Sequence, residues 1–296
     1  MRRSGVSFSI VGPGRVGSSL AKALVQEGWH CDSIVGQTGG GLREHELSRR
    51  LPGVHLVDSI SSLGPDFDLL FLTVTDDHIG RVASELAVVR GIDWTGKTVL
   101  HTSGIVTVAS LRKLKLAGAH TGALHPIAPF ATPFSPRSAR NIYYDFLGDD
   151  ASRKLAFRVT KDLSSKLLVM RSERDRALLH ISSVILSNFT VIGALTAEEL
   201  LSDFILKKDI KMLSNRLLSS TFNNLNKAHG VSGLTGPLAR GDLGIIGKHL
   251  KSLENNSALL QFYRSASLLG IRALLKAERR PARRKNLLEI KKLLEG

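Results

Sequence analysis

Two hydrophobic periodicities divide the chain. Up to about residue 171, short apolar runs alternate with stretches of helical spacing, which is typical of strands joined by crossover helices. Beyond Glu173 only helical spacing recurs, with breaks at 230–233 and 236–237. The pattern predicts an α/β domain over residues 1–171 and an all-α domain over residues 172–296. The expected strands are Phe8–Val11, His30–Val35, Val54–Val57, Asp68–Val74, Thr98–His101, Ala119–Leu124, Asn141–Leu147 and Lys166–Met170.

A glycine motif directly follows the first strand. Gly12, Gly14 and Gly17 form Gly-x-Gly-x-x-Gly, and residues 20–24 continue at helical spacing. The first glycine permits a tight turn, the second lets a pyrophosphate approach the backbone, and the third lets the helix pack closely on the sheet. The helix would direct its N-terminal N–H groups at the phosphates. The predicted cofactor-binding residues at this turn are Gly12, Pro13, Gly14, Arg15, Val16 and Gly17.

The end of the second strand bears on the choice of cofactor. Asp32 lies at about the spacing at which NAD-selective folds place a carboxylate for the ribose hydroxyls. Because Ser33–Val35 continues the strand, its tip is expected at Gly36, Gln37 and Thr38, where no carboxylate lies. A neutral tip tolerates a 2′-phosphate better than an acidic one. The sequence therefore favours NADP, with NAD as the alternative.

Polar clusters follow several of the predicted strands. They are the glycine turn, Gln37–Thr38, Val74–Asp76, Ser103–Gly104 and His125–Pro126. Ligands of open α/β sheets bind outside the carboxyl ends of the strands, so these clusters are expected to converge along one edge. Each cluster taken singly is equally compatible with a turn or a helix cap. Val74, Thr75 and Asp76 are the further predicted cofactor contacts.

Two of these clusters carry candidate catalytic residues. His125 is the first candidate for proton transfer, because imidazole titrates near neutral pH and Pro126 restrains the backbone. An ordinary loop histidine is the alternative. Ser103 is a candidate for a hydrogen bond to a substrate carboxylate or to the nicotinamide amide. A metal site at Asp76–His78 is not expected, because neighbouring side chains diverge at the start of a helix.

Residues 177–197 contain no charged side chain and are about long enough to span a bilayer. Their polar content favours instead a helix buried between protein layers, or between subunits. Four polar residues share one side of this helix and either bond to each other or line the cleft under the cofactor. They are His180, Ser183, Ser187 and Asn188.

A glycine-rich turn in the second half carries a charged pair. Arg240 could clamp a substrate carboxylate or phosphate, because a guanidinium binds such groups through two hydrogen bonds. An ion pair between Arg240 and Asp242 is the structural alternative.

Composition narrows the class of protein. The chain has 296 residues, a net charge of +15 and a single cysteine, Cys31, so it cannot form an intrachain disulfide. That fits a reducing, cytoplasmic setting. The C-terminal basic residues are expected to form a solvated helix face, with an anionic partner as the alternative. An aromatic content of only 5% argues against stacking on single-stranded nucleic acid, so neither nucleic-acid nor membrane partners are expected.

Together these motifs resemble a family that joins a Rossmann-like domain to a helical domain of unknown function, DUF2520, related to the 6-phosphogluconate dehydrogenase superfamily. With the strand-end convergence, the resemblance implies an NADP-dependent oxidoreductase acting on a small, anionic carbonyl or hydroxyl substrate. It also implies a homodimer formed through the helical domain. A cofactor-binding sensor or assembly protein without catalysis is the alternative. The segments that carry the resemblance are GPGRVG (12–17), TVTDDHI (73–79), HTSG (101–104), LHPIAPF (124–130), LLHISSVILSN (178–188) and LTGPLARGDLGIIGKHLKSL (234–253).

Two related families refine the expected roles. The His125–Pro126 pair is similar to the histidine–proline motif of prephenate dehydrogenases, in which the histidine contacts the substrate hydroxyl. The helix around Asn188 resembles the one that carries a catalytic lysine, with an asparagine one turn later, in β-hydroxyacid dehydrogenases. Here Val184 stands at the lysine position. His125 or His180 must then supply the proton, or the chemistry is different or absent.

Overall fold

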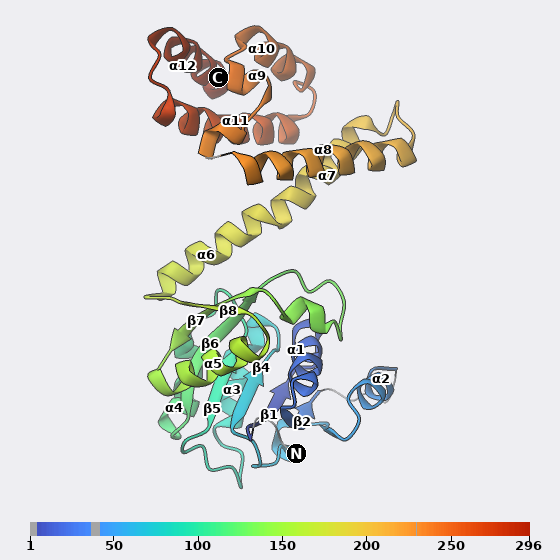
Figure 1. The fold of residues 1–296 in the computed structure, drawn as a ribbon, viewed down its shortest axis with the longest axis vertical. Helices are drawn as coiled ribbons and strands as arrows, with labels where there is room; N and C mark the ends of the chain where they lie inside the picture. Colours follow the sequence, from blue (N-terminus) through green and yellow to red (C-terminus); the bar gives the residue numbers. More distant parts are fainter. Residues whose placement is uncertain (1–4, 37–41, 229) are drawn as a thin grey trace. The chain divides into compact units, whose positions relative to one another are not determined.

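The computed structural model describes residues 5–36, 42–228 and 230–296 (Figure 1). It divides the chain into two compact units, Met1–Ile192 and Gly193–Gly296. The sheet lies entirely in the first unit, and the described part of the second unit is helical. The predicted order of an α/β region followed by an all-α region is therefore confirmed.

An eight-stranded sheet forms the centre of the first unit, in the order β3-β2-β1-β4-β5-β6-β7-β8. From β3 to β6 the strands pair in parallel, in the order of a doubly wound dinucleotide-binding fold. β7 runs antiparallel to β6, a reversal that the alternating sequence pattern did not predict. The strands are β1 (Ser7–Val11), β2 (His30–Val35), β3 (His55–Val57), β4 (Leu69–Leu72), β5 (Thr98–His101), β6 (His120–Ile127), β7 (Tyr143–Gly148) and β8 (Lys166–Val169).

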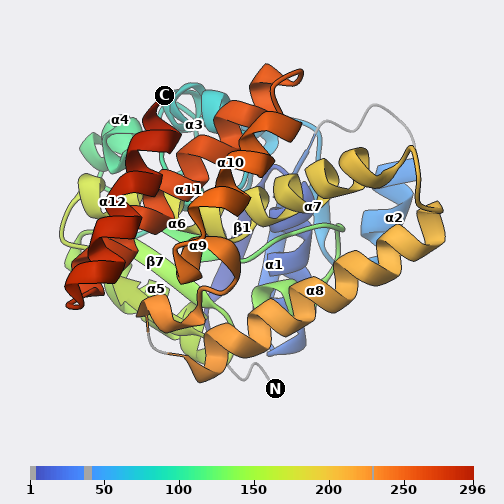
Figure 2. The same cartoon turned by 90° about the horizontal axis from the view of Figure 1, so that it is seen from above.

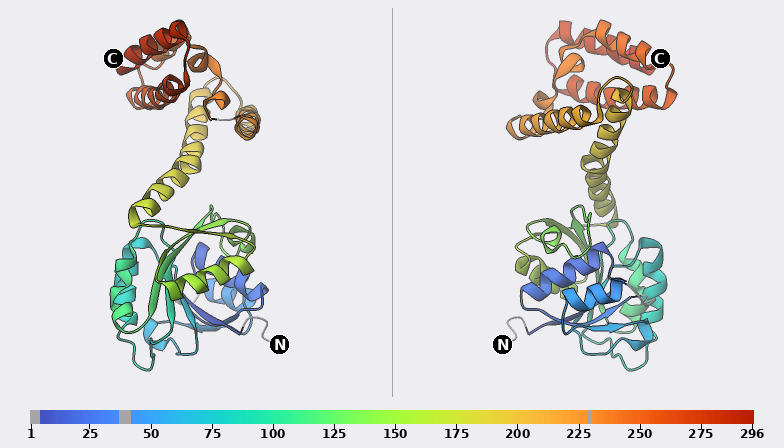
Figure 3. Two further views of the ribbon diagram at one scale, coloured as in Figure 1. Left: turned by 60° about the vertical axis from the view of Figure 1, so that its left-hand side comes forward. Right: turned by 90° about the vertical axis from the view of Figure 1, so that its right-hand side faces the viewer.

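Helices cover both faces of the sheet, which explains why its central strands are apolar throughout. β4 shows this clearly, because successive side chains of a strand point to opposite faces. Leu69 and Phe71 join the core with α1 and α5, whereas Leu70 and Leu72 join the core with α3 and α4. Figure 3 shows the two helical layers on either side of the strands. The helices of this unit are α1 (Arg15–Gln26), α2 (Leu42–Arg50), α3 (Asp76–Leu86), α4 (Arg112–Leu116), α5 (Asp150–Asp162) and α6 (Glu173–Leu186), with 3₁₀ turns η1 (Ile60–Ser62), η2 (Val108–Leu111) and η3 (Pro136–Ala139).

The second unit has its own apolar core between α10, α11 and α12 (Figure 2). Ile246, Ile271 and Ile290 are among its fully buried members. Local sequence sets the helix ends. Gly241 caps α9 in the left-handed region at φ +80°, and Pro281 occupies the first turn of α12. The remaining elements are α7 (Asn188–Leu201), which spans the division, α8 (Lys207–Lys227), η4 (Gly230–Gly233), α9 (Gly236–Arg240), α10 (Leu243–Ser252), α11 (Ser257–Ala277) and α12 (Pro281–Glu295).

The uncharged stretch 177–197 forms most of α6 and α7, with an irregular residue between them at Ser187. By length and composition the helical segment Glu173–Leu201 could cross a membrane, and its most apolar window is not buried. The rest of the described chain does not cover this window, so burial between protein layers stays a prediction. Arg176 alone among the described residues of α6 and α7 is buried, because only the start of α6 packs into the first unit. Burial between subunits stays a prediction.

The end of the sheet and the end of the first compact unit do not coincide. The last strand ends at Val169, next to the predicted boundary at residue 171, whereas the compact unit extends to Ile192. The difference arises because Arg176 anchors α6 to the sheet through buried hydrogen bonds. The division into residues 1–171 and 172–296 stays a prediction.

Candidate active site

The three glycines of the turn after β1 differ in why a side chain is absent. Gly12 has φ +96°, and a Cβ on it would lie 2.8 Å from the backbone nitrogen of Val74. A Cβ on Gly17 would lie 2.5 Å from the Gly12 carbonyl oxygen. Gly14 differs, because no described atom lies within 4 Å of the position its Cβ would take. Packing therefore requires two of the glycines, while the third leaves open space in front of α1.

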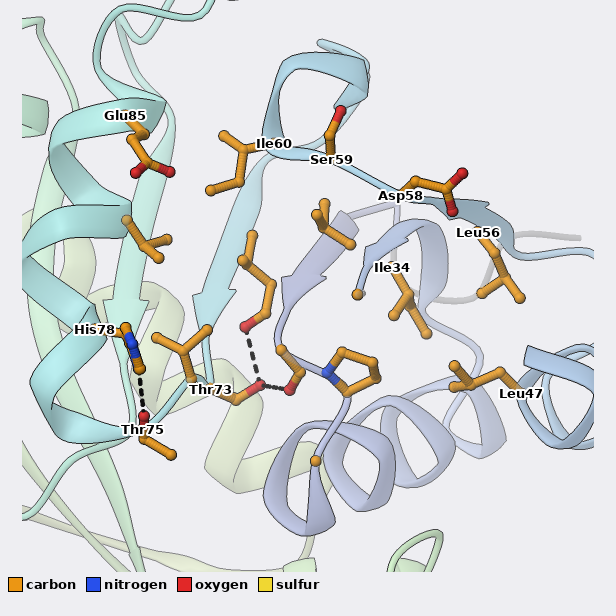
Figure 4. Close-up of a pocket in the computed structure, with 18 of the residues that line it drawn as sticks. Ile34, Leu47, Leu56, Asp58, Ser59, Ile60, Thr73, Thr75, His78 and Glu85 are labelled. Carbon is orange, nitrogen blue, oxygen red and sulfur yellow. Dashed lines mark hydrogen bonds between the residues drawn. The ribbon is translucent and has the colours of Figure 1, made fainter. Parts of the chain in front are cut away.

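Hydrogen bonds hold this turn in place. The Thr73 hydroxyl donates to the Gly12 carbonyl at 2.5 Å (Figure 4), and the Ser18 hydroxyl donates to the Gly14 carbonyl at 2.6 Å. Among the residues that the structure describes, no side chain caps the N-terminus of α1. Its first N–H groups are thus available to an anionic ligand, which the helix dipole would also favour.

An open cleft of about 1460 Å³ begins at the glycine turn (Figure 4). It is lined by the ends of β1, β2 and β3, by the segment after β4 and by one side of α3. Val16 packs on the core and Asp76 does not line the cleft, whereas Gln37 and Thr38 lie outside the described residues. The predicted cofactor residues that do line it are Gly12, Pro13, Gly14, Arg15, Val74 and Thr75.

The carboxylate of Asp32 is not at the tip of the second strand. Asp32 lies within β2, which continues to Val35, and its Oδ2 accepts a 2.6 Å hydrogen bond from the Ser33 hydroxyl. The interpretation of Asp32 as a mid-strand residue is confirmed. The cleft does contain acidic side chains that the sequence did not single out, among them Asp58 after β3 and Glu46 on α2. The basic side chains lining it include Arg15, Arg81 and Arg90.

The sequence predicted His125 just after a strand that ends at Leu124. This is wrong, because His125 lies inside β6. The strand continues to Ile127 because it pairs with the antiparallel β7, which brings Asp145 directly opposite His125. The imidazole Nδ1 is 2.7 Å from Asp145 Oδ2. Asp145 is completely buried, whereas the His125 side chain keeps 15% of its surface exposed. The imidazole is therefore fixed on one side and open on the other.

Arg176 in α6 completes a buried network around this pair. Its Nε donates to Asp145 Oδ1 at 3.0 Å. One terminal nitrogen donates to the Val106 carbonyl and to Glu173, and the other donates to the Ser103 carbonyl. Neither Asp145 nor Arg176 was predicted from the sequence as a site residue. The available signal was a carboxylate in the middle of an otherwise apolar strand, since a buried carboxylate needs a charged or hydrogen-bonding partner.

His180, one turn beyond Arg176, packs against His125. The two ring centroids are 5.4 Å apart and the planes meet at 67°. The backbone of Gly104 lies against both rings, since a Cβ there would be 2.5 Å from His180 Nδ1 and 3.0 Å from His125 Nε2. Burial, and then the proximity of His125, lower the pKa of His180, although the charges of Asp76 and Asp145 act in the opposite direction.

His101 and Ser103, at the end of β5 and just after it, are both buried within the protein. The Ser103 hydroxyl accepts hydrogen bonds from the backbone N–H groups of Ile105 and Val106, which closes the turn. His101 is completely buried, and neither ring nitrogen has a hydrogen-bond partner among the described residues. Burial, reinforced by the charge of Arg176, lowers the pKa of His101 to about 3.

The remaining candidates already have hydrogen-bond partners near them in sequence; they are Ser183, Ser187, Asn188 and Arg240. The hydroxyls of Ser183 and Ser187 donate to carbonyls of their own helix, and Asn188 accepts a 2.8 Å hydrogen bond from Ser187. Arg240 belongs to the second unit, where its Nε donates to Asp242 at 2.9 Å. The structure thus brings Ser103, His125 and His180 together. The catalytic roles assigned to them, and to Asn188 and Arg240, stay predictions.

Two sequence-family profiles match the chain. One describes a Rossmann-like domain and matches residues 1–126, and the other describes a domain of unknown function, DUF2520, and matches residues 142–269. No curated protein matches the chain by sequence.

Similar solved structures share the fold at low identity. A Bacteroides fragilis protein, provisionally assigned as an NADP oxidoreductase, has 20% identity and a TM-score of 0.70 over 88% of this chain and 96% of its own. A Thermotoga maritima protein gives the same identity and TM-score over 92% and 100%. Pyrroline carboxylate reductase from Plasmodium falciparum, solved with NADP bound, has 12% identity and a TM-score of 0.59 over 98% of both chains.

Proposed function

This chain carries a Rossmann-like domain followed by a DUF2520 domain, and from that premise we propose that it is an NADP-dependent oxidoreductase. The reaction is the transfer of hydride to or from a small, anionic substrate at a carbonyl or hydroxyl carbon. A bound nicotinamide would supply or accept the hydride.

One observation carries this proposal: the glycine turn and His125 lie along the same edge of one sheet. In the parallel register, Val11, Leu72 and His101 end β1, β4 and β5, and Ala123 of the longer β6 stands beside His101. His125 lies two residues beyond Ala123 on that edge. A dinucleotide with its pyrophosphate at the glycine turn therefore has its reactive end in reach of the strands that carry the histidine.

The cleft supports a dinucleotide in particular. Gly14 leaves space for a pyrophosphate, and the uncapped start of α1 offers N–H groups to it. We favour NADP because Asp32 is turned to Ser33 within β2, so that it is unavailable at the strand tip. NAD is the alternative, because Asp58 and Glu46 also line the cleft and a carboxylate can bind the ribose hydroxyls of NAD. The pyrroline carboxylate reductase from Plasmodium falciparum was solved with NADP bound, and a reductive aminase of similar fold from Aspergillus terreus was solved with NADPH4.

His125 supports catalysis over a purely cofactor-binding role. Val184 occupies the position where β-hydroxyacid dehydrogenases carry lysine, which leaves the site without that proton donor. An imidazole held by a carboxylate is a competent replacement, because it can give and take a proton near neutral pH. Arg240, which pairs with Asp242 in the second unit, stays a candidate for binding a carboxylate or phosphate.

We further propose that the chain forms a homodimer through its helical region. α7 and α8 expose many large apolar side chains, whereas a helix with apolar residues on all sides is normally buried. A second copy of the same surface would cover them without placing the hydroxyls and Asn188 in lipid. On α8 the exposed apolar residues are Met212, Leu213, Leu217, Leu218, Phe222 and Leu225.

Cofactor binding is the direct test of this function. Addition of NADPH at about a hundredfold over its dissociation constant should stabilise the protein by roughly 2.7 kcal/mol, with a clear rise in melting temperature. If saturating NADP(H) and NAD(H) both leave the melting temperature unchanged, the proposal is wrong. Binding without turnover of any keto acid, aldehyde or imine would support the non-catalytic alternative.

A further inference from the structure

We infer that Asp145 and Arg176 are positioning residues that hold His125 as the proton donor of the reaction. The inference rests on the proposed oxidoreductase function and deepens it. Three elements meet at this point, since His125 comes from β6, Asp145 from β7 and Arg176 from α6.

Arg176 supplies the partner charge that a buried Asp145 carboxylate requires. Its side chain is 0% exposed, and an isolated buried carboxylate would be strongly destabilised. Arg176, whose side chain is 1% exposed, places its Nε 3.0 Å from one carboxylate oxygen. Because the guanidinium keeps its proton in proteins, this contact supplies a permanent positive charge beside the carboxylate. The other carboxylate oxygen remains free to accept a proton-bearing nitrogen.

The Asp145 carboxylate, paired with Arg176, determines which nitrogen of His125 carries hydrogen. A carboxylate can only accept hydrogen bonds, so Nδ1 at 2.7 Å must be the donor. In the neutral ring Nε2 is then the unprotonated nitrogen, and in the cation it carries the transferable proton. Nε2 lies on the side of Gly104 and His180, away from Asp145.

Several charged or titratable groups surround the two imidazoles. Burial, then His125 and Arg176, lower the pKa of His180. Asp145 and Asp76 favour protonation, and His101 stays neutral because of its burial. Of the two imidazoles, His125 is the one whose ring nitrogen contacts the Asp145 carboxylate directly.

The chemical step follows from this arrangement. In the reducing direction, a bound reduced nicotinamide would supply hydride to the carbonyl carbon as the carbon–oxygen π pair moves to oxygen. The oxygen takes the Nε2 proton of the His125 cation, which leaves a neutral imidazole with Nδ1–H still bonded to Asp145. Solvent returns the proton afterwards. Oxidation runs through the same steps in reverse, with Nε2 as the base.

Arg176 also connects this residue pair to the neighbouring loop. Its terminal nitrogens donate to the carbonyls of Ser103 and Val106, which follow β5. The same side chain therefore fixes the Asp145 carboxylate and the backbone next to Gly104. Replacement by lysine keeps the charge but cannot reproduce this forked set of hydrogen bonds.

The tautomer of His125 tests the inference independently of activity. Two-bond ¹H–¹⁵N spectra of the full-length protein, with His125 assigned from the His125→Gln variant, report which ring nitrogen carries hydrogen. We expect the Nδ1–H form in the neutral ring. A neutral His125 with hydrogen on Nε2 would overturn the inference, whether or not the protein turns over any substrate.

Kinetics on a substrate that the wild type reduces provide the second test. Asp145→Asn should lower kcat at least tenfold, leave the dissociation constant of NADPH unchanged and shift the pH profile of kcat. Asp162→Asn is the matched control, because Asp162 accepts a hydrogen bond from the Trp29 indole elsewhere in the unit. In His125→Ala, the additional Asp145→Asn change should cost nothing further. If Asp145→Asn lowers kcat by the same factor in the wild type and in His125→Ala, Asp145 does not act through His125. If the wild type turns over no substrate, the proposed function is contradicted, and the tautomer measurement still tests the inference.

Discussion

His125 and Asp145 stand directly opposite each other on β6 and β7, with Nδ1 of the imidazole 2.7 Å from Oδ2 of the carboxylate. They are twenty residues apart in sequence and meet only because β7 reverses the direction of the sheet. Arg176 then reaches the same carboxylate from a helix that begins after the last strand. The site therefore combines two strands of the sheet with α6, all within the first compact unit.

Gly14→Ala should separate ligand binding from stability. A Cβ on Gly14 meets no described atom within 4 Å, so the free protein should keep its melting temperature. The added methyl group occupies the space proposed for the pyrophosphate, so NADPH should bind at least tenfold more weakly. Isothermal titration calorimetry and thermal unfolding measure the two effects.

Gly17→Ala is the matched comparison for Gly14→Ala. Its Cβ would lie 2.5 Å from the Gly12 carbonyl oxygen, so α1 must move away from the sheet. We expect a loss of about 1–3 kcal/mol of stability without ligand, the usual cost of overpacking. Equal stabilities of the two variants would contradict the distinction between a packing glycine and a ligand-facing glycine.

Gly104→Ala should damage the histidine pair and leave the cofactor cleft intact. The new Cβ would lie 2.5 Å from His180 Nδ1 and 3.0 Å from His125 Nε2, so one of the rings must shift. Turnover should fall at least tenfold, while the affinity for NADPH stays within about twofold because Gly104 does not line the cleft. A tenfold fall in turnover corresponds to a rise of about 1.4 kcal/mol in the activation barrier.

Gly80→Ala on α3 serves as its control. No described atom lies within 4 Å of that Cβ, and alanine is a better helix former than glycine. This variant should gain about 0.5–1 kcal/mol of stability and keep wild-type turnover. Unchanged turnover in Gly104→Ala would show that the two histidines do not act at the positions proposed.

His101 should make the protein sensitive to acid. Burial depresses its pKa from 6.5 to about 3 in the folded state. Between these values the unfolded chain binds more protons than the folded protein, so stability falls as the pH falls. The loss attributable to His101 approaches about 1.4 kcal/mol per pH unit.

Replacement of His101 by leucine isolates this contribution. Both ring nitrogens lack hydrogen-bond partners among the described residues, so an apolar side chain should be tolerated at pH 7. Urea unfolding at pH 7 and pH 4.5 should show a smaller difference for the variant than for the wild type. The same difference in both proteins would rule out His101 as the source.

The proposed dimer predicts a specific effect on assembly. Leu218 and Phe222 share one side of α8 at a spacing of one turn, and both are exposed. If each contributes about 1.5–3 kcal/mol at an interface, changing both to glutamate should weaken the dimer at least a hundredfold. Light scattering after size-exclusion chromatography should show the mass halved, whereas Ser219→Glu should leave the dimer intact. A wild-type monomer at micromolar concentration would contradict the dimer.

The sequence by itself determined the order of the elements and the place of the glycine turn. Spacing of apolar residues is a local property, so β2 and β5 begin and end at the predicted residues. The same spacing placed Asp32 inside β2. Strand pairing is not local, and for that reason the extent of β6 and the antiparallel direction of β7 were not predicted.

Only the tertiary structure decided which polar residues meet. The Ser103 hydroxyl closes a turn, Arg240 pairs with Asp242, and the serines of α6 bond to their own helix. Asp145 and Arg176, which no motif marked, instead enclose His125. Burial explains the difference, because a charged side chain excluded from water must find its partner wherever the fold brings one, whatever the distance along the chain.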